Sequence, residues 1–297
     1  MICAILATGC AAQKAAAPAE TGNRELLKWA DFEYLGAFSA PRIFSNAKHG
    51  DRYGYSKGTM CWNPQGDPGG EKDGFPGSIM IPGHDGLVGE FSIVPPKKLG
   101  EKDKQKDGTY DTRKLPAGKQ LGSFFDPTSG KKNVFPKRGE NWRGLWWDGD
   151  LLHMSWSLWY DVGGVKNYRH HMAAKRNPDG TWETVIEPYS MKIRPHRCAG
   201  HITTAPKWWA DEHLGGRRFL TGFNVAQGTG ASNCGPGLYA YDPKKPDDAL
   251  TLMEFPHSKA TRDEMWRPED AWRGVVFIDT GTKYALMFCG RKSLGDV

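Results

Sequence analysis

The sequence lacks the short motifs that mark several large classes of enzyme. It contains no GxSxG, HExxH or P-loop motif, so no such signature assigns a serine nucleophile, a zinc protease site or a phosphate-binding loop. No CxxC pair occurs among its six cysteines, which leaves a zinc ribbon unsupported. No stretch approaches the roughly 18 apolar residues that a membrane-spanning helix needs.

Glycine, proline and aromatic residues are abundant instead. The 297 residues include 37 Gly and 20 Pro, and 12% are aromatic, a composition that favours short strands joined by turns over long helices. Hydrophobic residues make up 38% of the chain, which is enough to bury a core. The composition therefore predicts an all-β protein.

The first residues resemble the end of a bacterial lipoprotein signal. A short apolar run ends in Ala7-Thr-Gly-Cys10, which is similar to a lipobox with Cys10 as the lipidated residue. A charged leading segment is missing and the apolar run is short, as a start codon placed too late would explain; a frayed tail is the alternative. We expect a signal and linker at 1–20, a main domain at 21–297, and export as a periplasmic, cell-surface or secreted protein. The predicted membrane contact is the lipid anchor at Cys10.

The net charge of +6 is spread along the chain, with one dense basic region between Lys97 and Lys119. Acidic residues are mixed into that region, which indicates a solvated loop rather than a nucleic-acid surface. We therefore expect no nucleic-acid partner.

An internal repeat organises the rest of the chain. Trp142-Arg-Gly and Trp272-Arg-Gly each precede an apolar strand, an Asp/Gly turn and a second apolar strand, which is the pattern of a β-hairpin. Similar strands recur elsewhere, so the predicted unit has four strands over roughly 55–80 residues. Such units would span Gly54–Asp126, Asn141–Ile193 and Cys198–Phe255, with a fourth starting at Trp272.

Four-stranded repeats of this kind predict the blades of a β-propeller, of which about 3.5 are present. Because the fourth unit stops early, we expect a C-terminally truncated propeller of roughly 6–8 blades. A small open β-sandwich is the alternative. The best helical segment begins at Pro206 and ends before Gly215, between the first two strands of the third unit.

Propeller geometry predicts where a ligand would bind. Loops that enter the first strand of a blade share one face with loops that join its second and third strands. Arginines there suit carboxylates or sulfates, and Trp or Tyr rings suit sugars. The predicted substrate-binding residues on this face are His84, Arg143, Trp159, Asn224 and Arg273.

The densest cluster of reactive side chains is Arg194–His201, ahead of a first strand. It could supply a general base or, with a cysteine from a Gly-rich loop, a tetrahedral zinc set of His196, Cys198, His201 and Cys234. Packed histidines with a Cys198–Cys234 disulfide are the alternative. No cofactor is required, and a structural zinc or calcium ion is left open.

A second cluster is Tyr168-Arg-His-His171. Alternation along a strand would place Tyr168 and His170 on one face and Arg169 and His171 on the other, with one histidine directed inwards. A solvated strand edge is the alternative.

Four segments resemble secreted bacterial β-propeller proteins: Phe32–Phe38, Gly74–Asp85, Trp142–Trp147 and Gly235–Tyr241. Some propellers of this broad type are polysaccharide lyases, including ulvan lyases. The resemblance implies a polysaccharide or glycan partner, and a β-elimination in which Arg neutralises a uronate and His or Tyr moves the protons. The candidates for those catalytic roles are His201, Arg197, Tyr160, Tyr168, His171 and Arg267. A non-catalytic surface lipoprotein that binds glycan or protein is the alternative.

Overall fold

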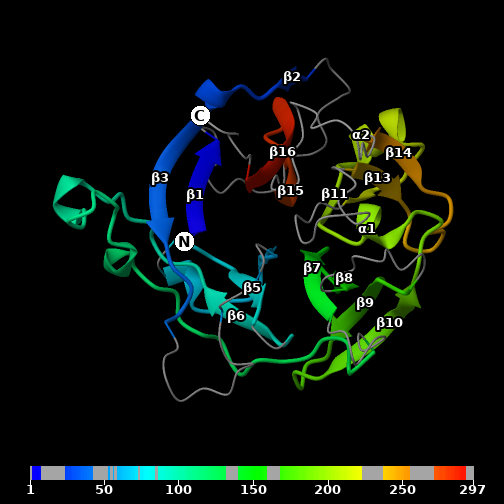
Figure 1. Ribbon diagram of the computed structural model, residues 1–297, viewed down its shortest axis with the longest axis horizontal. Helices are drawn as coiled ribbons and strands as arrows, with labels where there is room; N and C mark the ends of the chain where they lie inside the picture. Colours follow the sequence, from blue (N-terminus) through cyan, green and yellow to red (C-terminus); the bar gives the residue numbers. More distant parts are fainter. Residues whose placement is uncertain are drawn as a thin grey trace. The chain divides into compact units, whose positions relative to one another are not determined.

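The chain is an all-β protein, as its composition predicts (Figure 1). The computed structural model describes residues 2–7, 24–42, 53, 56, 59–72, 74–83, 86–131, 140–158, 168–222, 237–254 and 271–291. Two compact units divide it. Unit 1 comprises Met1–Tyr55, Trp62–Phe125 and Ile278–Ala285, and unit 2 comprises Ser56–Cys61, Asp126–Phe277 and Leu286–Val297.

Unit 2 contains a four-stranded antiparallel sheet built from consecutive strands. These are β7 (Glu140–Trp147), β8 (Leu151–Leu158), β9 (His171–Arg176) and β10 (Trp182–Tyr189), paired in chain order. Asp148 stabilises the tight turn after β7 because its carboxylate accepts two backbone N–H groups. The four strands lie where the second predicted repeat places them.

A second four-stranded sheet in unit 2 has the same topology. It consists of β11 (Ile202–Thr204), β12 (Phe219–Thr221), β13 (Gly237–Tyr241) and β14 (Leu250–Glu254), again in chain order. Two short helices accompany it: α1 (Pro195–Cys198) precedes β11, and α2 (Lys207–His213) lies between β11 and β12, which confirms the predicted helix after Pro206.

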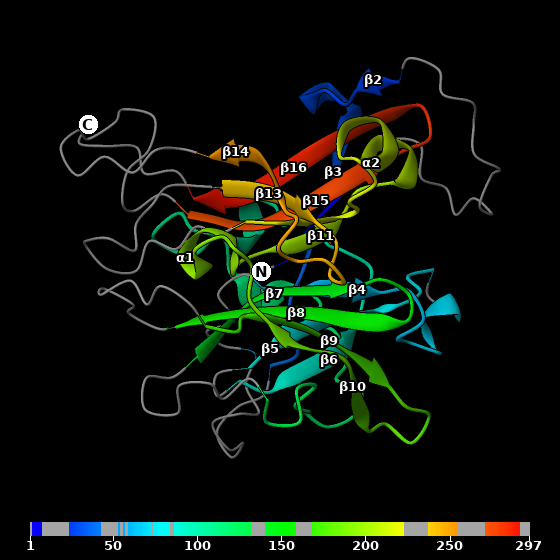
Figure 2. The same cartoon turned by 90° about the vertical axis from the view of Figure 1, so that its right-hand side faces the viewer.

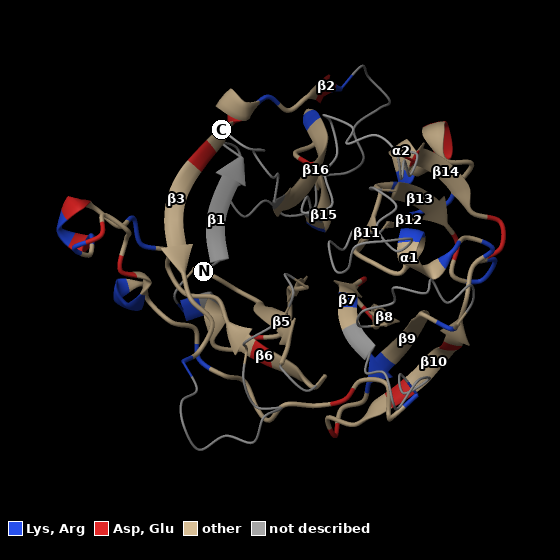
Figure 3. Cartoon of the chain, viewed as in Figure 1, with Lys and Arg blue, Asp and Glu red and all other residues tan. Residues whose placement is uncertain are grey.

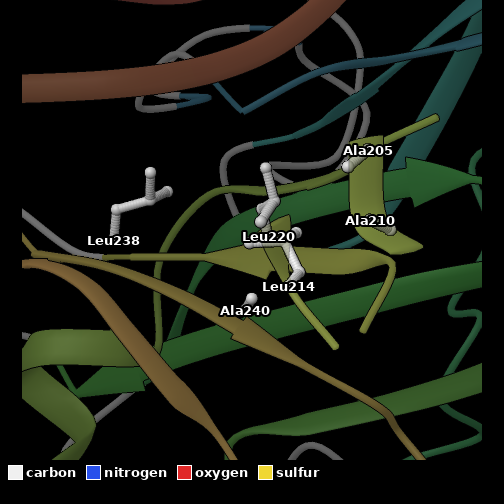
Figure 4. Packing of buried hydrophobic residues seen from close by; sticks show 6 residues of the cluster. All are labelled: Ala205, Ala210, Leu214, Leu220, Leu238 and Ala240. Carbon is white, nitrogen blue, oxygen red and sulfur yellow. The ribbon is translucent and has the colours of Figure 1, made fainter. Parts of the chain in front are cut away.

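The two faces of the second sheet have different packing, because side chains alternate along each strand. One face packs against α2 in an aliphatic cluster that includes Leu214, Leu220 and Leu238 (Figure 4). The other carries Tyr239 and Tyr241, which pack with residues that precede β11. This second face lies against the first sheet (Figure 2).

The glycine of the repeated Trp-Arg-Gly motif has a packing role in its first copy. A Cβ atom at Gly144 would collide with the carbonyl oxygen of Gly200 and lie 2.9 Å from Ile202 Cγ1. The absence of a side chain at Gly144 therefore lets the segment ahead of β11 approach β7 closely.

The second Trp-Arg-Gly copy starts the predicted hairpin of β15 (Ala271–Asp279) and β16 (Lys283–Arg291). Its third strand was not predicted: β2 (Glu25–Leu26) pairs parallel with β16. An ion pair between Arg24 and Asp279, with 2.8 Å between Nη1 and Oδ1, stabilises this pairing of distant segments.

Unit 1 contains a sheet of β4 (Cys61–Asn63), β5 (Ser78–Pro82) and β6 (Val88–Ser92). The fourth strand of the first predicted repeat would lie near Leu121–Phe125, before Asp126. This segment forms no continuous ladder, and isolated antiparallel bridges join Phe125 to Val88 and Gln120 to Phe91.

The backbone of β1 (Ile2–Ala7) pairs antiparallel with β3 (Phe32–Phe38) in unit 1. This strand lies within the predicted export signal, and export stays a prediction. Short 3-10 turns occur at Trp29–Asp31, Gly70–Lys72, Glu101–Asp103 and Thr112–Lys114.

Among the described residues, no sheet closes on itself, so the propeller remains a proposal. No helix in the described part of the chain is long and apolar enough to cross a membrane.

Candidate functional site

Polar side chains gather at one end of each four-stranded sheet of unit 2. In an antiparallel sheet of consecutive strands, the first and third strands start at the end where the second and fourth strands finish. In the first sheet β7 and β9 start at this end, and in the second sheet β11 and β13 do. We call it the starting end of each sheet. The first sheet brings Arg143, Ser157, Tyr168 and His171 to its starting end, and the second brings His201, Tyr239 and Glu254, with Arg197 beside them.

Arg143 lies at the starting end of the first sheet. Its guanidinium is buried and its Nε donates to Ser157 Oγ at 2.7 Å. Burial, and then the charge of Arg273, lower the pKa of Arg143 to about 9, against the raising effect of Tyr168. The structure therefore brings together three predicted residues: the arginines of both Trp-Arg-Gly copies and a tyrosine whose hydroxyl accepts the N–H of Leu158 at 3.4 Å.

A buried chain of hydrogen bonds joins the two sheets behind this site. His170 Nδ1 and His171 Nδ1 are 2.5 Å apart, and His171 Nε2 lies 3.2 Å from Thr221 Oγ1. The Thr221 hydroxyl donates to the carbonyl oxygen of Cys198 at 2.6 Å or of His201 at 3.0 Å. Cys198 Sγ lies 3.8 Å from His170 Nε2.

These contacts determine the tautomers of both histidines. The hydrogen of the Thr221 hydroxyl goes to a carbonyl, so its oxygen accepts a hydrogen bond from His171 Nε2–H. In neutral His171 the lone pair is then on Nδ1, which accepts from His170 Nδ1–H. His170 Nε2 then carries a lone pair and lies 3.8 Å from Cys198 Sγ, whose thiol donates to the carbonyl oxygens of Ile193 and Arg194. The hydrogen-bonded chain thus runs from His170 through His171 and Thr221 to the Cys198–His201 segment.

The hydrogen-bonded chain through His170 and His171 is uncharged at neutral pH. Burial lowers the pKa of His170 to about 3, and burial with the neighbouring His170 and His153 lowers the pKa of His171 well below its ordinary value. Burial also raises the pKa of the Cys198 thiol. Both histidines are fully buried, which excludes the solvated strand edge considered for them. Both ring nitrogens of His171 take part in this hydrogen-bonded chain, so it is a structural residue rather than an exposed base.

The same network positions the Arg194–His201 segment. Thr221 of β12 binds carbonyls of this segment, and the Ser155 hydroxyl of β8 donates to the Gly200 carbonyl. The segment is therefore held from both sheets by buried hydrogen bonds, which keeps the residues that it carries in a defined place.

Arg197, carried by α1, makes an ion pair that the sequence did not indicate. Its Nη1 lies 2.7 Å from Glu254 Oε1, and the Tyr239 hydroxyl donates to the same oxygen at 2.7 Å. Register alone could have identified Glu254, because the last residue of β14 pairs with Gly237 at the starting end. Arg197 is therefore already neutralised by a carboxylate of its own chain.

His201 has a different environment from Arg197. Its ring lies edge-on to Phe288 at 6.4 Å, and its Nε2 is 2.7 Å from the position that a Cβ of Gly222 would occupy. Burial lowers the pKa of His201 to about 4, and neither ring nitrogen has a hydrogen-bond partner among the described residues. Alternation along β11 and β13 directs His201 and Tyr239 to opposite faces, so the structure does not join His201 with Arg197 in one catalytic group.

The predicted zinc set is only partly within the described residues. Cys198 is a free thiol next to His170, and His196 is buried in α1. No group of three His, Cys, Asp or Glu side chains suited to a metal ion occurs among the residues that the structure describes. Cys234 lies outside them, and a zinc or calcium ion stays a prediction.

Several other predicted site residues also lie outside the described part of the chain: His84, Trp159, Tyr160, Asn224 and Arg267.

Comparison of the chain with protein-family models, with curated proteins and with solved structures gives no match.

Proposed function

We propose that the chain is an exported β-propeller protein that binds an anionic polysaccharide at the starting ends of its sheets. The propeller is supported by the topology of unit 2, in which four-stranded antiparallel sheets follow one another along the chain and pack face to face, as blades do. A third hairpin, β15–β16, begins with the same Trp-Arg-Gly motif as the first sheet.

The observation that carries the binding function is the pairing of Arg143 with Arg273 beside Tyr168. Two like charges near each other create a positive potential that attracts an anion. Arginine binds carboxylate and sulfate groups through two parallel hydrogen bonds, and a tyrosine offers a ring to a sugar. Acidic polysaccharides present both groups along one chain.

A polysaccharide lyase is the second candidate, favoured by the proximity of a tyrosine hydroxyl to an arginine at Tyr168 and Arg143. Elimination also needs a base and an acid that converge on one sugar. His171 is occupied inside the buried chain, and Arg197 is paired with Glu254. These contacts favour binding over elimination.

Gel retardation and ultraviolet absorbance distinguish the two candidates. The chain is run through gels that contain ulvan, polygalacturonate or neutral dextran, and is incubated with the same polymers. We expect retardation by the acidic polymers alone and no absorbance from new C=C bonds. A steady rise in absorbance would establish the lyase instead, and equal mobility in all gels would refute binding.

Arg273→Gln tests the site within the same experiment. We expect at least a tenfold loss of affinity, since one of the paired cations is removed, about 1.4 kcal/mol of binding free energy. Arg176→Gln is the matched control, because Arg176 ends β9 at the opposite end of the sheet. Equal losses in both variants would indicate a non-specific charge effect.

Export is tested at the lipobox. We expect wild type to be labelled by a palmitate analogue and to sediment with membranes, and Cys10→Ala to lose both properties. Equal labelling of the variant would refute the anchor.

A further inference from the structure

Unit 2 has an open hollow of about 510 Å³ beside the first sheet. Its volume falls within the roughly 300–1,000 Å³ of small-ligand sites. Three segments line it: Arg169 ahead of β9, Tyr189 and Ser190 at the end of β10, and the turn Lys245–Asp248 between β13 and β14. None of these residues belongs to the site described above.

The charges that line the hollow are unequally paired. Asp248 accepts from Arg217 Nη2 at 2.7 Å, and Asp247 lies 3.8 Å from Lys192. Arg169 and Lys245 are exposed, and no carboxylate among the described residues pairs with either of them. The hollow therefore has two cations that no described carboxylate pairs with, whereas each of its carboxylates has a basic partner. Figure 3 shows charged residues of both signs around the β13–β14 turn.

Both cations extend from ordered backbone. The turn is fixed by Asp242, whose carbonyl accepts the N–H of Lys245 at 2.9 Å and whose carboxylate accepts the N–H of Lys244 at 2.9 Å. Arg217 Nε adds a bond to the Asp248 carbonyl at 2.7 Å. On the opposite wall, the residue after Arg169 donates its N–H to the Tyr189 carbonyl at 2.9 Å. A ligand thus pays little to order the backbone of this hollow.

The remaining lining suits one ring of a sugar. Tyr189 and Pro246 are half-buried and offer apolar surface, and Ser190 offers a hydroxyl. Apolar surface with a few polar groups is the usual composition of a small-ligand site, and an aromatic side chain beside a hydroxyl suits the mixed surface of a sugar. The same residues offer little to a neutral apolar ligand, because the hollow is open and rimmed by charges.

We propose that this hollow binds one acidic sugar residue of the polysaccharide, with its carboxylate or sulfate between Arg169 and Lys245 and its ring against Tyr189 and Pro246. This subsite rests on the proposed function. It adds a second contact to the same polymer, since Arg169 follows Tyr168 directly and extends from the starting end of the same sheet.

The test measures the affinity of the full chain for polygalacturonate and dextran sulfate by titration calorimetry at fixed ionic strength. The variant is Arg169→Gln with Lys245→Gln. The control is Lys106→Gln with Lys244→Gln, which removes the same charge from exposed lysines that do not line the hollow. All substituted residues are exposed, and unchanged melting temperatures verify that the fold is intact.

We expect the hollow variant to bind at least tenfold more weakly than wild type, because it loses direct contacts with the ligand. The control should stay within about twofold, because it loses only surface charges that salt screens. The acidic group is identified by which polymer loses more affinity. Wild-type affinity in the hollow variant, or equal losses in both variants, would overturn the subsite and leave the proposed function intact. Absence of wild-type binding to either polymer would overturn the proposed function and the subsite with it.

Discussion

Each unit contains one buried polar cluster, and the two clusters satisfy their hydrogen bonds in different ways. In unit 1 the Glu90 carboxyl is a single centre, whose Oε1 accepts from Ser78 Oγ at 2.5 Å and from Asn63 Nδ2 at 3.2 Å. In unit 2 the chain through His170 and His171 has no centre, and each group both donates and accepts. Buried polar groups must be paired in either design. The difference is that the hydrogen bonds of the first cluster all depend on the Glu90 carboxyl. Those of the second depend on each group keeping its protonation state, because every group in the chain is neutral.

Acidification should produce the largest effect, and it should act on unit 2. The folded pKa values of His170, His171 and His201 are lowered, so their unfolded forms bind protons first as the pH falls below about 6.5. The contribution of the neutral histidines to the free energy of unfolding is therefore complete above that pH. It is lost as the pH falls towards their pKa values in the folded protein. His201 alone would cost roughly 3 kcal/mol by pH 4.

Hydrogen exchange resolved by peptide, with intrinsic rates corrected for pH, compares the two clusters. Between pH 7 and pH 4, β9 and β12 should lose protection before β5 and β6. His213→Gln, which replaces an exposed histidine, is the control and should leave this difference unchanged. Equal loss of protection in both units would contradict the comparison.

Glu90→Ala should have the next largest effect, because two buried donors lose their shared acceptor and a cavity remains. We expect a loss of about 3 kcal/mol in the free energy of unfolding of unit 1. Glu90→Gln keeps the shape and one acceptor oxygen, and should cost less than half as much in denaturant titrations. If the two substitutions cost the same, the carboxyl is not the centre of the cluster.

Thr221→Val breaks one link of the neutral chain without changing its shape. The His171 Nε2–H and the carbonyls bound by the hydroxyl then lack a partner, and we expect a loss of about 2 kcal/mol. Denaturant titration followed by tryptophan fluorescence measures it. An unaltered unfolding midpoint would show that the hydrogen bonds of Thr221 contribute nothing to stability.

Thr203→Val is the matched substitution with the smallest expected effect. Thr203 lies in β11 and is equally buried, but its hydroxyl has no hydrogen-bond partner among the described residues. Its replacement removes an unpaired polar group, so we expect a change within about 0.5 kcal/mol or a small gain. A loss as large as that of Thr221→Val would mean that hydrogen bonding is not the cause of either effect.

Much of unit 2 could be predicted because its strands are local. Apolar runs separated by Asp/Gly turns identify β7 and β8 and the hairpin of β15 and β16, since a hairpin pairs residues that are close in the chain. The parallel pairing of β2 with β16 was missed, because it joins residues about 258 positions apart and no local pattern encodes such a partner.

The candidate site was predicted less completely than the strands. The starting ends of the sheets follow from strand order. Arg143, Tyr168 and Arg273 were predicted as site residues, and the charges of Arg273 and Tyr168 act on Arg143. The sequence could not show that Glu254 neutralises Arg197, or that His171 is enclosed in a hydrogen-bonded chain. Those outcomes depend on which side chains of different strands meet.

The sequence by itself determined the all-β class and the repeated four-strand order of unit 2. Periodicity and turn residues are local properties, and they suffice for those features. Only the tertiary structure decided which histidines are buried and neutral, which arginine charges act on each other and which carboxylates are already paired. Burial and charge pairing are set by groups far apart in sequence, and these groups change the pKa and the availability of each side chain.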